Sequence, residues 1–175
     1  MAETPQPIHN ELHRIAITGI IWRKDADGRI RYLLTKRAPT KKAWPNRWTV
    51  PGGGLEVGDY MNTEATYQNT ESPQWYGAVE NTLRREVREE VGLEISDVQY
   101  LLDLAFIRPD GIPVIVLSYY ARYESGEVVL DEDSVDHAWA MLDELPKYEL
   151  ISGIDHEIAL VEERLKQIHK SDLCI

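Results

Sequence analysis

Hydrophobic and polar positions along the chain alternate between short apolar runs and two stretches of helical spacing. The runs are rich in β-branched residues, a composition typical of strands. We expect strands at residues 15–22, 31–37, 48–50, 98–107, 113–123, 128–130 and 137–141. The turn sequence Asp25-Ala26-Asp27-Gly28 separates the first two runs, so these two strands are predicted to form a hairpin.

Two segments carry the spacing of amphipathic helices. Leu83, Val87 and Val91 stand at i, i+4 and i+8 within residues 80–91, and Gly92 follows as a C-terminal stop signal. Residues 155–169 repeat the pattern near the end of the chain. Strands on both sides of the first helix predict an α/β (α+β) fold with helices flanking a mixed central sheet.

The length of 175 residues suits one domain, and the chain contains neither an internal repeat nor a linker. Residues 1–13 have the polar composition of a flexible N-terminal leader, and residues 14–175 are expected to form the single domain.

Charge narrows the range of partners. The chain has 19 Lys and Arg against 30 Asp and Glu, a formal net charge of −11, which disfavours nucleic acid and anionic membranes. Small anionic ligands stay possible because a bound metal ion inverts the local sign. Cys174 is the single cysteine, the N-terminus lacks a signal peptide, and the apolar stretch at 112–121 is too short to cross a bilayer. We therefore expect a cytoplasmic protein with a small-molecule partner and with neither nucleic acid nor membrane as partner.

The first predicted helix crowds carboxylates onto one face. Glu86 and Glu90 are four residues apart and Glu89 lies beside them, so the three repel one another unless a positive charge offsets them. A hard cation such as Mg²⁺ would do so, whereas a solvated charged face is the alternative interpretation. The upstream run Pro51-Gly52-Gly53-Gly54 favours the first interpretation, because glycines permit close approach of the backbone to a ligand.

Together these residues resemble the signature of Nudix (MutT-like) hydrolases, G-x5-E-x7-R-E-U-x-E-E-x-G-U, where U is bulky and aliphatic. Gly53 opens this box, which ends at residue 93. Its C-terminal part is matched in order and spacing by Arg85, Glu86, Val87, Glu89, Glu90, Gly92 and Leu93.

Two departures from the pattern concern the first half of the box. Asp59 stands where the pattern has its first glutamate, and 25 residues replace the next seven, an insertion of 18 placed at about residues 60–77. Glu64 or Glu71 could take the displaced role instead. An insertion of this length is either a substrate-capping loop or a decoration.

The resemblance implies an α/β/α sandwich that hydrolyses a nucleoside diphosphate linked to another group, with Mg²⁺ or Mn²⁺. Carried over by position, Glu86, Glu89 and Glu90 would bind metal, with the Gly52 carbonyl as a further ligand, and Arg85 would hold the carboxylates in place. The catalytic residues would then be Glu89, Glu86 and Arg85. The general base is either Glu89 or the acidic loop at 131–133, which is otherwise a solvated turn.

Substrate contacts are predicted less directly. Arg37, Trp44 and Arg47 are candidates, and Lys41 and Lys42 add to the basic loop. Each of these residues could instead be a surface residue or a loop anchor without a role in binding. The same two interpretations, a substrate contact or a loop anchor, apply to the aromatic residues of the insertion, Tyr60, Tyr67, Trp75 and Tyr76.

The substrate class is left open between several possibilities. Pro109 lies at a spacing from the box that resembles ADP-ribose-type members, so an ADP-ribose or nucleotide-sugar substrate is the leading hypothesis. A nucleoside triphosphate pyrophosphohydrolase is the enzymatic alternative, and a non-catalytic nucleotide-binding regulatory domain is the alternative of another class. The oligomeric state is unassigned, and a homodimer is possible.

Overall fold

A computed structural model describes residues 12–67 and 73–172. Its strands are β1 (Arg14–Lys24), β2 (Ile30–Arg37), β3 (Trp48–Thr49), β4 (Gly52–Gly54), β5 (Glu94–Ile107), β6 (Pro113–Ser125) and β7 (Ser134–Ala140). Its helices are α1 (Gly58–Met61), α2 (Ala78–Val91), the 3₁₀ helix η1 (Leu142–Lys147) and α3 (Ile154–Asp172).

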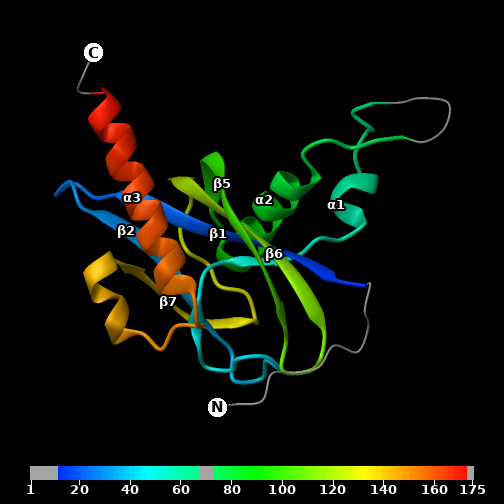
Figure 1. Cartoon of the computed structure of the whole chain (residues 1–175), viewed down its shortest axis with the longest axis horizontal. Coiled ribbons are helices and arrows are strands. Elements are labelled where there is room, and N and C mark those ends of the chain that lie inside the picture. The colour runs from blue at the N-terminus through cyan, green and yellow to red at the C-terminus, as the bar shows by residue number, and fades with distance from the viewer. Residues whose placement is uncertain (1–11, 68–72, 173–175) are drawn as a thin grey trace.

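Within the described ranges, the seven strands form one mixed sheet (Figure 1). The main order is β3-β2-β1-β6-β5, with β4 paired to β1 and β7 paired to β2. β1 and β6 run parallel, whereas the other pairs are antiparallel. β1 and β2 pair as antiparallel neighbours across the Asp25–Gly28 turn, so the predicted hairpin is confirmed.

The alternating residues of β1 separate two hydrophobic clusters, one on each face of the sheet. Ile17 and Ile21 pack with Leu83 and Val87 of α2. Ile20 faces the other way, into the cluster under α3. Because neighbouring strand residues point to opposite faces, this alternation places α2 and α3 on opposite sides of the sheet. The predicted fold class, a mixed sheet between helices, is confirmed.

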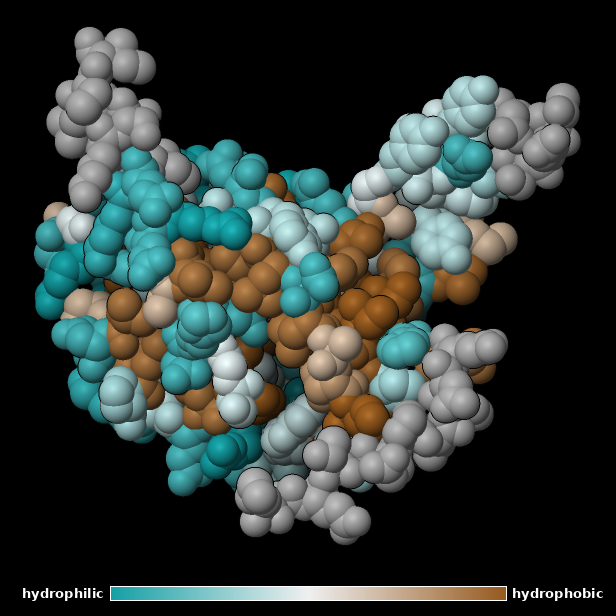
Figure 2. Space-filling model, in the orientation of Figure 1, coloured by the Kyte–Doolittle hydropathy of each residue, from teal (hydrophilic) through white to brown (hydrophobic). Residues whose placement is uncertain are grey.

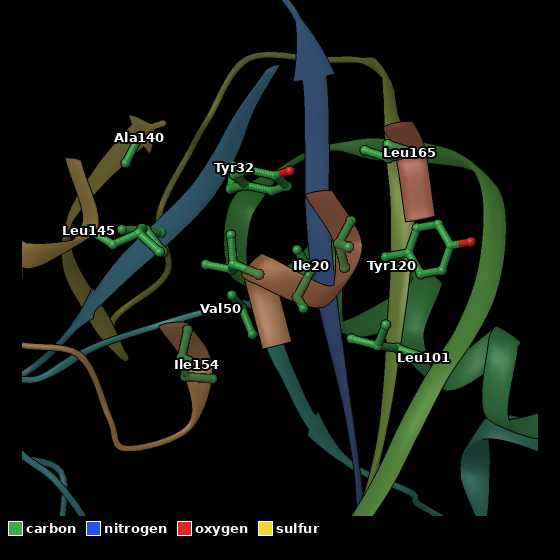
Figure 3. Packing of buried hydrophobic residues seen from close by; sticks show 12 residues of the cluster. Ile20, Tyr32, Val50, Leu101, Tyr120, Ala140, Leu145, Ile154 and Leu165 are labelled. Carbon is green, nitrogen blue, oxygen red and sulfur yellow. The ribbon is translucent and has the colours of Figure 1, made fainter. Parts of the chain in front are cut away.

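The cluster under α3 joins this helix to the centre of the sheet. Ile154 and Leu165 of α3 lie in the same buried cluster as Ile20 of β1 and Tyr120 of β6 (Figure 3). The space-filling view shows hydrophobic residues gathered beside α3 and over the β5–β6 side of this face (Figure 2). Among the helices described, none is both long and apolar enough to cross a membrane.

One predicted strand is wrong. Residues 128–130 belong to no strand, because the backbone there bonds to the end of α2. The amide of Val129 donates to the Val91 carbonyl at 3.0 Å, and the amide of Asp131 donates to the Glu90 carbonyl at 3.2 Å. The segment thus satisfies helix-end carbonyls that have no partner inside the helix. The last predicted strand also begins earlier, at Ser134.

Three short elements were not predicted, β4, α1 and η1. The glycines of β4 carry no side-chain pattern, although Gly52, Gly53 and Gly54 pair with β1. Between α1 and α2, an isolated bridge joins Tyr67 to Gln74. Residues 68–72 of the predicted insertion, with Glu71, and residues 1–11 of the predicted leader lie outside the described residues.

Candidate functional site

The triple glycine of β4 lets α2 approach the edge of β1. Gly52 has a φ of +147°, and a Cβ there would meet the Ile17 carbonyl oxygen and lie 2.7 Å from the Thr18 Cα. A Cβ on Gly53 would overlap the carboxylate of Glu86. Glycine is therefore needed at both positions, because any side chain would displace the strand or the carboxylate.

Arg85 connects the carboxylates of this region. Its guanidinium donates hydrogen bonds to Glu86 Oε1 at 2.9 Å, to Glu89 Oε2 at 2.8 Å and to the Gly54 carbonyl at 3.3 Å. Its Nε and Nη2 donate to the two oxygens of Asp59. One cation thus holds three side chains of like charge close together.

Asp59, which stands where the pattern has its first glutamate, contacts α2. Its side chain is only 2% exposed and is paired with Arg85. Its Oδ2 also accepts hydrogen bonds from the Glu56 amide at 2.9 Å and the Thr82 hydroxyl at 2.8 Å. The Arg85 hydrogen bonds, which outweigh desolvation, lower the pKa of Asp59 to about 2. Glu64 is exposed, whereas Asp59 contacts Thr82 and Arg85 of α2.

Among the glutamates of α2, Glu86 and Glu90 are the least exposed. Burial raises the pKa of Glu86, although Arg85 opposes that shift. Burial also raises the pKa of Glu90 to about 7, against a hydrogen bond of 2.8 Å that the Gly52 amide donates to its Oε2. Glu89 differs, because its side chain is 60% exposed.

The chemistry of these donors fits a hard divalent cation, since desolvated carboxylates gain most from a nearby positive charge. Glu86 and Glu90 occupy neighbouring turns of α2, and both line the same cleft as Gly52. In this arrangement they face Arg85 and the Gly52 amide. Over the described part of the chain, no three His, Cys, Asp or Glu side chains converge as a ready-made metal cluster.

The carboxylates open onto a cleft of about 1060 Å³. One part of its wall is charged, with the three glutamates of α2, Arg85 and residues of the basic and acidic loops. Another part is apolar and comes from β5, β6 and the start of α3; it includes Leu104, Phe106, Val114, Val116 and Ile154. A ligand with a charged end and a flat apolar end would match both parts.

Besides Arg14 and Arg85, the arginines Arg37 and Arg108 line the cleft. Arg37 ends β2, and its Nε donates to the Ala43 carbonyl at 3.0 Å. Burial lowers its pKa, while Glu90 and Asp133 favour its charged form. Arg108 follows β5, and its Nε is the buried side-chain polar atom that lacks a hydrogen-bond partner within the described residues. An unpartnered guanidinium nitrogen in a cleft is a ready donor to an anion.

Trp44 lies in the cleft, as predicted for a substrate contact. Its ring packs edge-on against Phe106, with centroids 5.7 Å apart, and both residues line the apolar part. Lys41 and Lys42 also line the cleft, and Lys41 pairs with Asp133. Asp131 and Asp133 of the acidic loop lie there too, so both candidates for the general base are in the cleft.

Other predicted contacts lie elsewhere. Arg47 is exposed, lies 4.0 Å from Glu149 and does not line the cleft. The aromatic residues of the insertion also do not line it. Tyr60 and Trp75 pack on each other with ring centroids 5.5 Å apart, and Trp75 donates to the Thr63 carbonyl, so these rings hold the segment together.

The sequence reasoning missed Arg108 and Glu157. Arg108 directly precedes Pro109, which we noted only for its spacing, and nothing in a single sequence distinguishes it from other strand-end arginines. Glu157 stands among apolar residues of a helix that was predicted only to cover the sheet. An acidic residue next to an apolar stripe was the available signal.

Known proteins place the chain in a family. The NUDIX domain model matches residues 70–160, which is more than half of the 175 residues. The nucleoside triphosphatase NudI of Salmonella paratyphi B is 28% identical over 139 residues, covering 74% of this chain and 86% of that protein. NudI of Salmonella schwarzengrund is 29% identical over the same length and coverage.

Solved structures agree on the fold. The NUDIX domain of Shewanella oneidensis NrtR in complex with ADP ribose superposes with a TM-score of 0.68 at 16% identity, covering 89% of this chain and 90% of that one. The MutT protein of Methanosarcina mazei gives a TM-score of 0.61 at 19% identity, with coverages of 94% and 99%. The chain therefore belongs to the Nudix family and is a Nudix hydrolase, an enzyme of the pyrophosphohydrolase class.

Proposed function

We propose that the cleft hydrolyses the diphosphate linkage of a nucleoside 5′-diphosphate that carries a further group. The observation that carries this proposal is the meeting of two kinds of charge in one cleft. Glu86 and Glu90 line it together with Arg37 and Arg108. The carboxylates suit a divalent cation, and the guanidiniums suit phosphate oxygens. Together they complement the charges of a metal-bound diphosphate.

Mg²⁺ or Mn²⁺ is the proposed cofactor, held by Glu86 and Glu90, with Glu89 and the Gly52 carbonyl as further ligands. A bound divalent cation neutralises phosphate oxygens and lowers the pKa of a coordinated water. The chain supports this arrangement through Arg85, whose hydrogen bonds fix the Glu86 and Glu89 carboxylates.

The other cleft residues orient the substrate. Arg37 and Arg108 are proposed to donate hydrogen bonds to phosphate oxygens, which places the diphosphate against α2. Trp44 and Phe106 form an apolar wall that excludes water and offers a surface for a base. Glu89 is the proposed general base, because it is the most solvent-accessible carboxylate of α2 in the cleft. Asp131 and Asp133 are the alternative candidates for the general base.

A nucleoside triphosphate, whose further group is a phosphate, is the second candidate substrate. The relatives named nucleoside triphosphatase NudI favour it, since they match 74% of the chain. The NUDIX domain of Shewanella oneidensis NrtR, which was solved with ADP ribose, is 16% identical to this chain, so its likeness concerns the fold and does not select the substrate.

Phosphate release, coupled to an added phosphatase, tests the proposal. The panel contains ADP-ribose, nucleotide sugars, dinucleotides, dinucleoside polyphosphates and the common ribo- and deoxyribonucleoside triphosphates, each with Mg²⁺, Mn²⁺ or EDTA. Turnover that requires metal supports the proposal, and the best substrate selects between the two candidates. Folded protein without metal-dependent turnover on the whole panel would refute it.

A further inference from the structure

A buried polar relay crosses the apolar part of the cleft. Ser118 of β6 donates a hydrogen bond to Glu157 Oε2 of α3. The Thr18 hydroxyl of β1 donates to Ser118 Oγ at 3.2 Å. Thr18 and Ser118 are register partners on neighbouring parallel strands, so the relay joins β1, β6 and α3 at one level of the sheet.

The surroundings of the relay are otherwise hydrophobic. On β6, Ser118 stands between Val116 and Tyr120 among the residues that face α3, and on β1 Thr18 holds the corresponding place before Ile20. Thr18 and Ser118 are thus polar residues within the apolar side chains that β1 and β6 direct toward α3, and they stand side by side in the sheet. This pair lies directly under Glu157, which is only 7% exposed.

Glu157 has acceptor capacity that the protein does not use. The Thr18 hydroxyl donates to Ser118, and the Ser118 hydroxyl donates to Glu157, so both hydroxyl hydrogens are used inside the relay and neither is left for a ligand. Over the described residues, the Oε1 of Glu157 accepts no hydrogen bond, although Glu157 lines the cleft. Burial raises the pKa of Glu157, which reflects the cost of a poorly solvated carboxylate. An N–H donor from a ligand would offset that cost.

The position of the relay relative to α2 suits a nucleotide. Thr18 pairs with Gly52 on one side and with Ser118 on the other. Gly52 holds Glu90 through its amide. Gly52, beside Glu90, and Ser118, beside Glu157, are therefore two strand spacings apart, about 10 Å. A nucleotide whose phosphates lie at α2 would place its base toward Val116, Ile154 and Glu157.

We infer that Glu157 recognises the nucleobase, accepting a hydrogen bond from an exocyclic amino group, so that cytosine is preferred to uracil and guanine to hypoxanthine. This inference rests on the proposed function, because it requires a nucleotide in the cleft. A carboxylate accepts from an amino group but is repelled by a carbonyl oxygen at the same position. The Val116 and Ile154 side chains, which also line the cleft, offer the base edge no hydrogen-bonding group.

The test uses binding of nucleoside monophosphates, which contain the base without the scissile linkage. Dissociation constants for CMP, UMP, GMP and IMP are measured by calorimetry on the full chain with Mg²⁺. We expect CMP to bind about tenfold more tightly than UMP, and GMP about tenfold more tightly than IMP, the size of one charge-assisted hydrogen bond. In Glu157→Gln both ratios are expected to fall toward one.

Two further variants make the outcome specific. Glu163→Gln changes an exposed glutamate of the same helix and should keep both ratios. Ser118→Ala removes the hydroxyl that orients Glu157 and should reduce both affinity ratios. This variant keeps the inference testable if Glu157→Gln fails to fold. Equal affinities in the native chain, or ratios unchanged in Glu157→Gln, would overturn the inference even if nucleotide turnover supports the proposed function. Absence of turnover together with the expected ratios would instead refute only the proposed function.

Discussion

The two helices that cover the sheet each direct glutamates into the same cleft, but they balance the charge by different means. On α2, the guanidinium of Arg85 holds Glu86, Glu89 and the nearby Asp59. On α3, Glu157 receives only the hydroxyl of Ser118. A cation that gathers several carboxylates creates a concentrated negative site, whereas a neutral donor leaves one carboxylate available to a neutral N–H group. The same residue type therefore suits phosphate chemistry at one helix and base recognition at the other.

The sharpest test of this comparison is the loss of one α2 carboxylate. Glu90→Gln keeps an oxygen that can accept the Gly52 amide hydrogen bond but removes the charge. Metal-dependent turnover should fall by at least about a hundredfold, because metal-assisted water activation is lost. Steady-state kinetics with and without EDTA measure the change, and Glu163→Gln is the matched control on α3. Full activity in Glu90→Gln would mean that α2 does not provide the metal site.

The next effect concerns stability rather than rate. Arg85→Gln leaves Asp59, 2% exposed, without its cation. Removing one partner of a buried pair costs about 3–5 kcal/mol, since the other charge stays desolvated. Urea unfolding at neutral pH measures the loss, and adding Asp59→Asn to Arg85→Gln should recover part of it. A loss well under 1 kcal/mol would show that water reaches Asp59.

The Asp59–Arg85 pair also predicts how the free energy of unfolding changes at low pH. The folded-state pKa of Asp59, about 2, lies below its ordinary value of 3.8, so the ionised group stabilises the fold above that value. This contribution is lost as the pH falls from about 4 toward 2. Thermal melts across this range should show a shallower acid decline for Asp59→Asn than for the native chain. Parallel declines would contradict the assignment.

A smaller change is expected at the arginines of the cleft. Arg108→Gln removes the guanidinium whose Nε has no protein partner, so substrate binding should weaken while the fold is kept. The expected result is a rise in KM of about tenfold, the loss of one charge-assisted hydrogen bond. Arg88→Gln, at an exposed position of α2 that pairs with Glu94, is the control for a lost cation. An unchanged KM would remove Arg108 from the phosphate contacts.

The smallest effect is expected at Glu157 in the absence of ligand. Its folded-state pKa is raised by burial, against the Ser118 hydrogen bond and the neighbouring His156. The contribution of Glu157 to stability is therefore greatest below the ordinary pKa of a glutamate and is lost as the pH rises through the raised value. Glu157→Gln should melt slightly higher than the native chain near neutral pH, with less difference in acid. A lower melting temperature at neutral pH would show that the charged form is stabilised by contacts beyond Ser118.

Periodicity and spacing were sufficient for much of the fold. The stripe of Leu83, Val87 and Val91 identified α2 and its buried face, because local side-chain spacing decides which face of a helix is apolar. The Nudix pattern likewise located the carboxylates of α2 and the role of Arg85. Residues 128–130 were misassigned as a strand, since an apolar β-branched triplet does not reveal that its amides bond to the end of a helix.

By itself, then, the sequence determined the fold class, the family and the acidic helix, all of which depend on patterns within short segments. Only the tertiary structure decided that Asp59 pairs with Arg85, that Arg108 lines the cleft while Arg47 does not, and that Ser118 links Glu157 to Thr18. These relations join residues far apart in the chain. Their partners are set by strand register and helix packing, which no local spacing encodes.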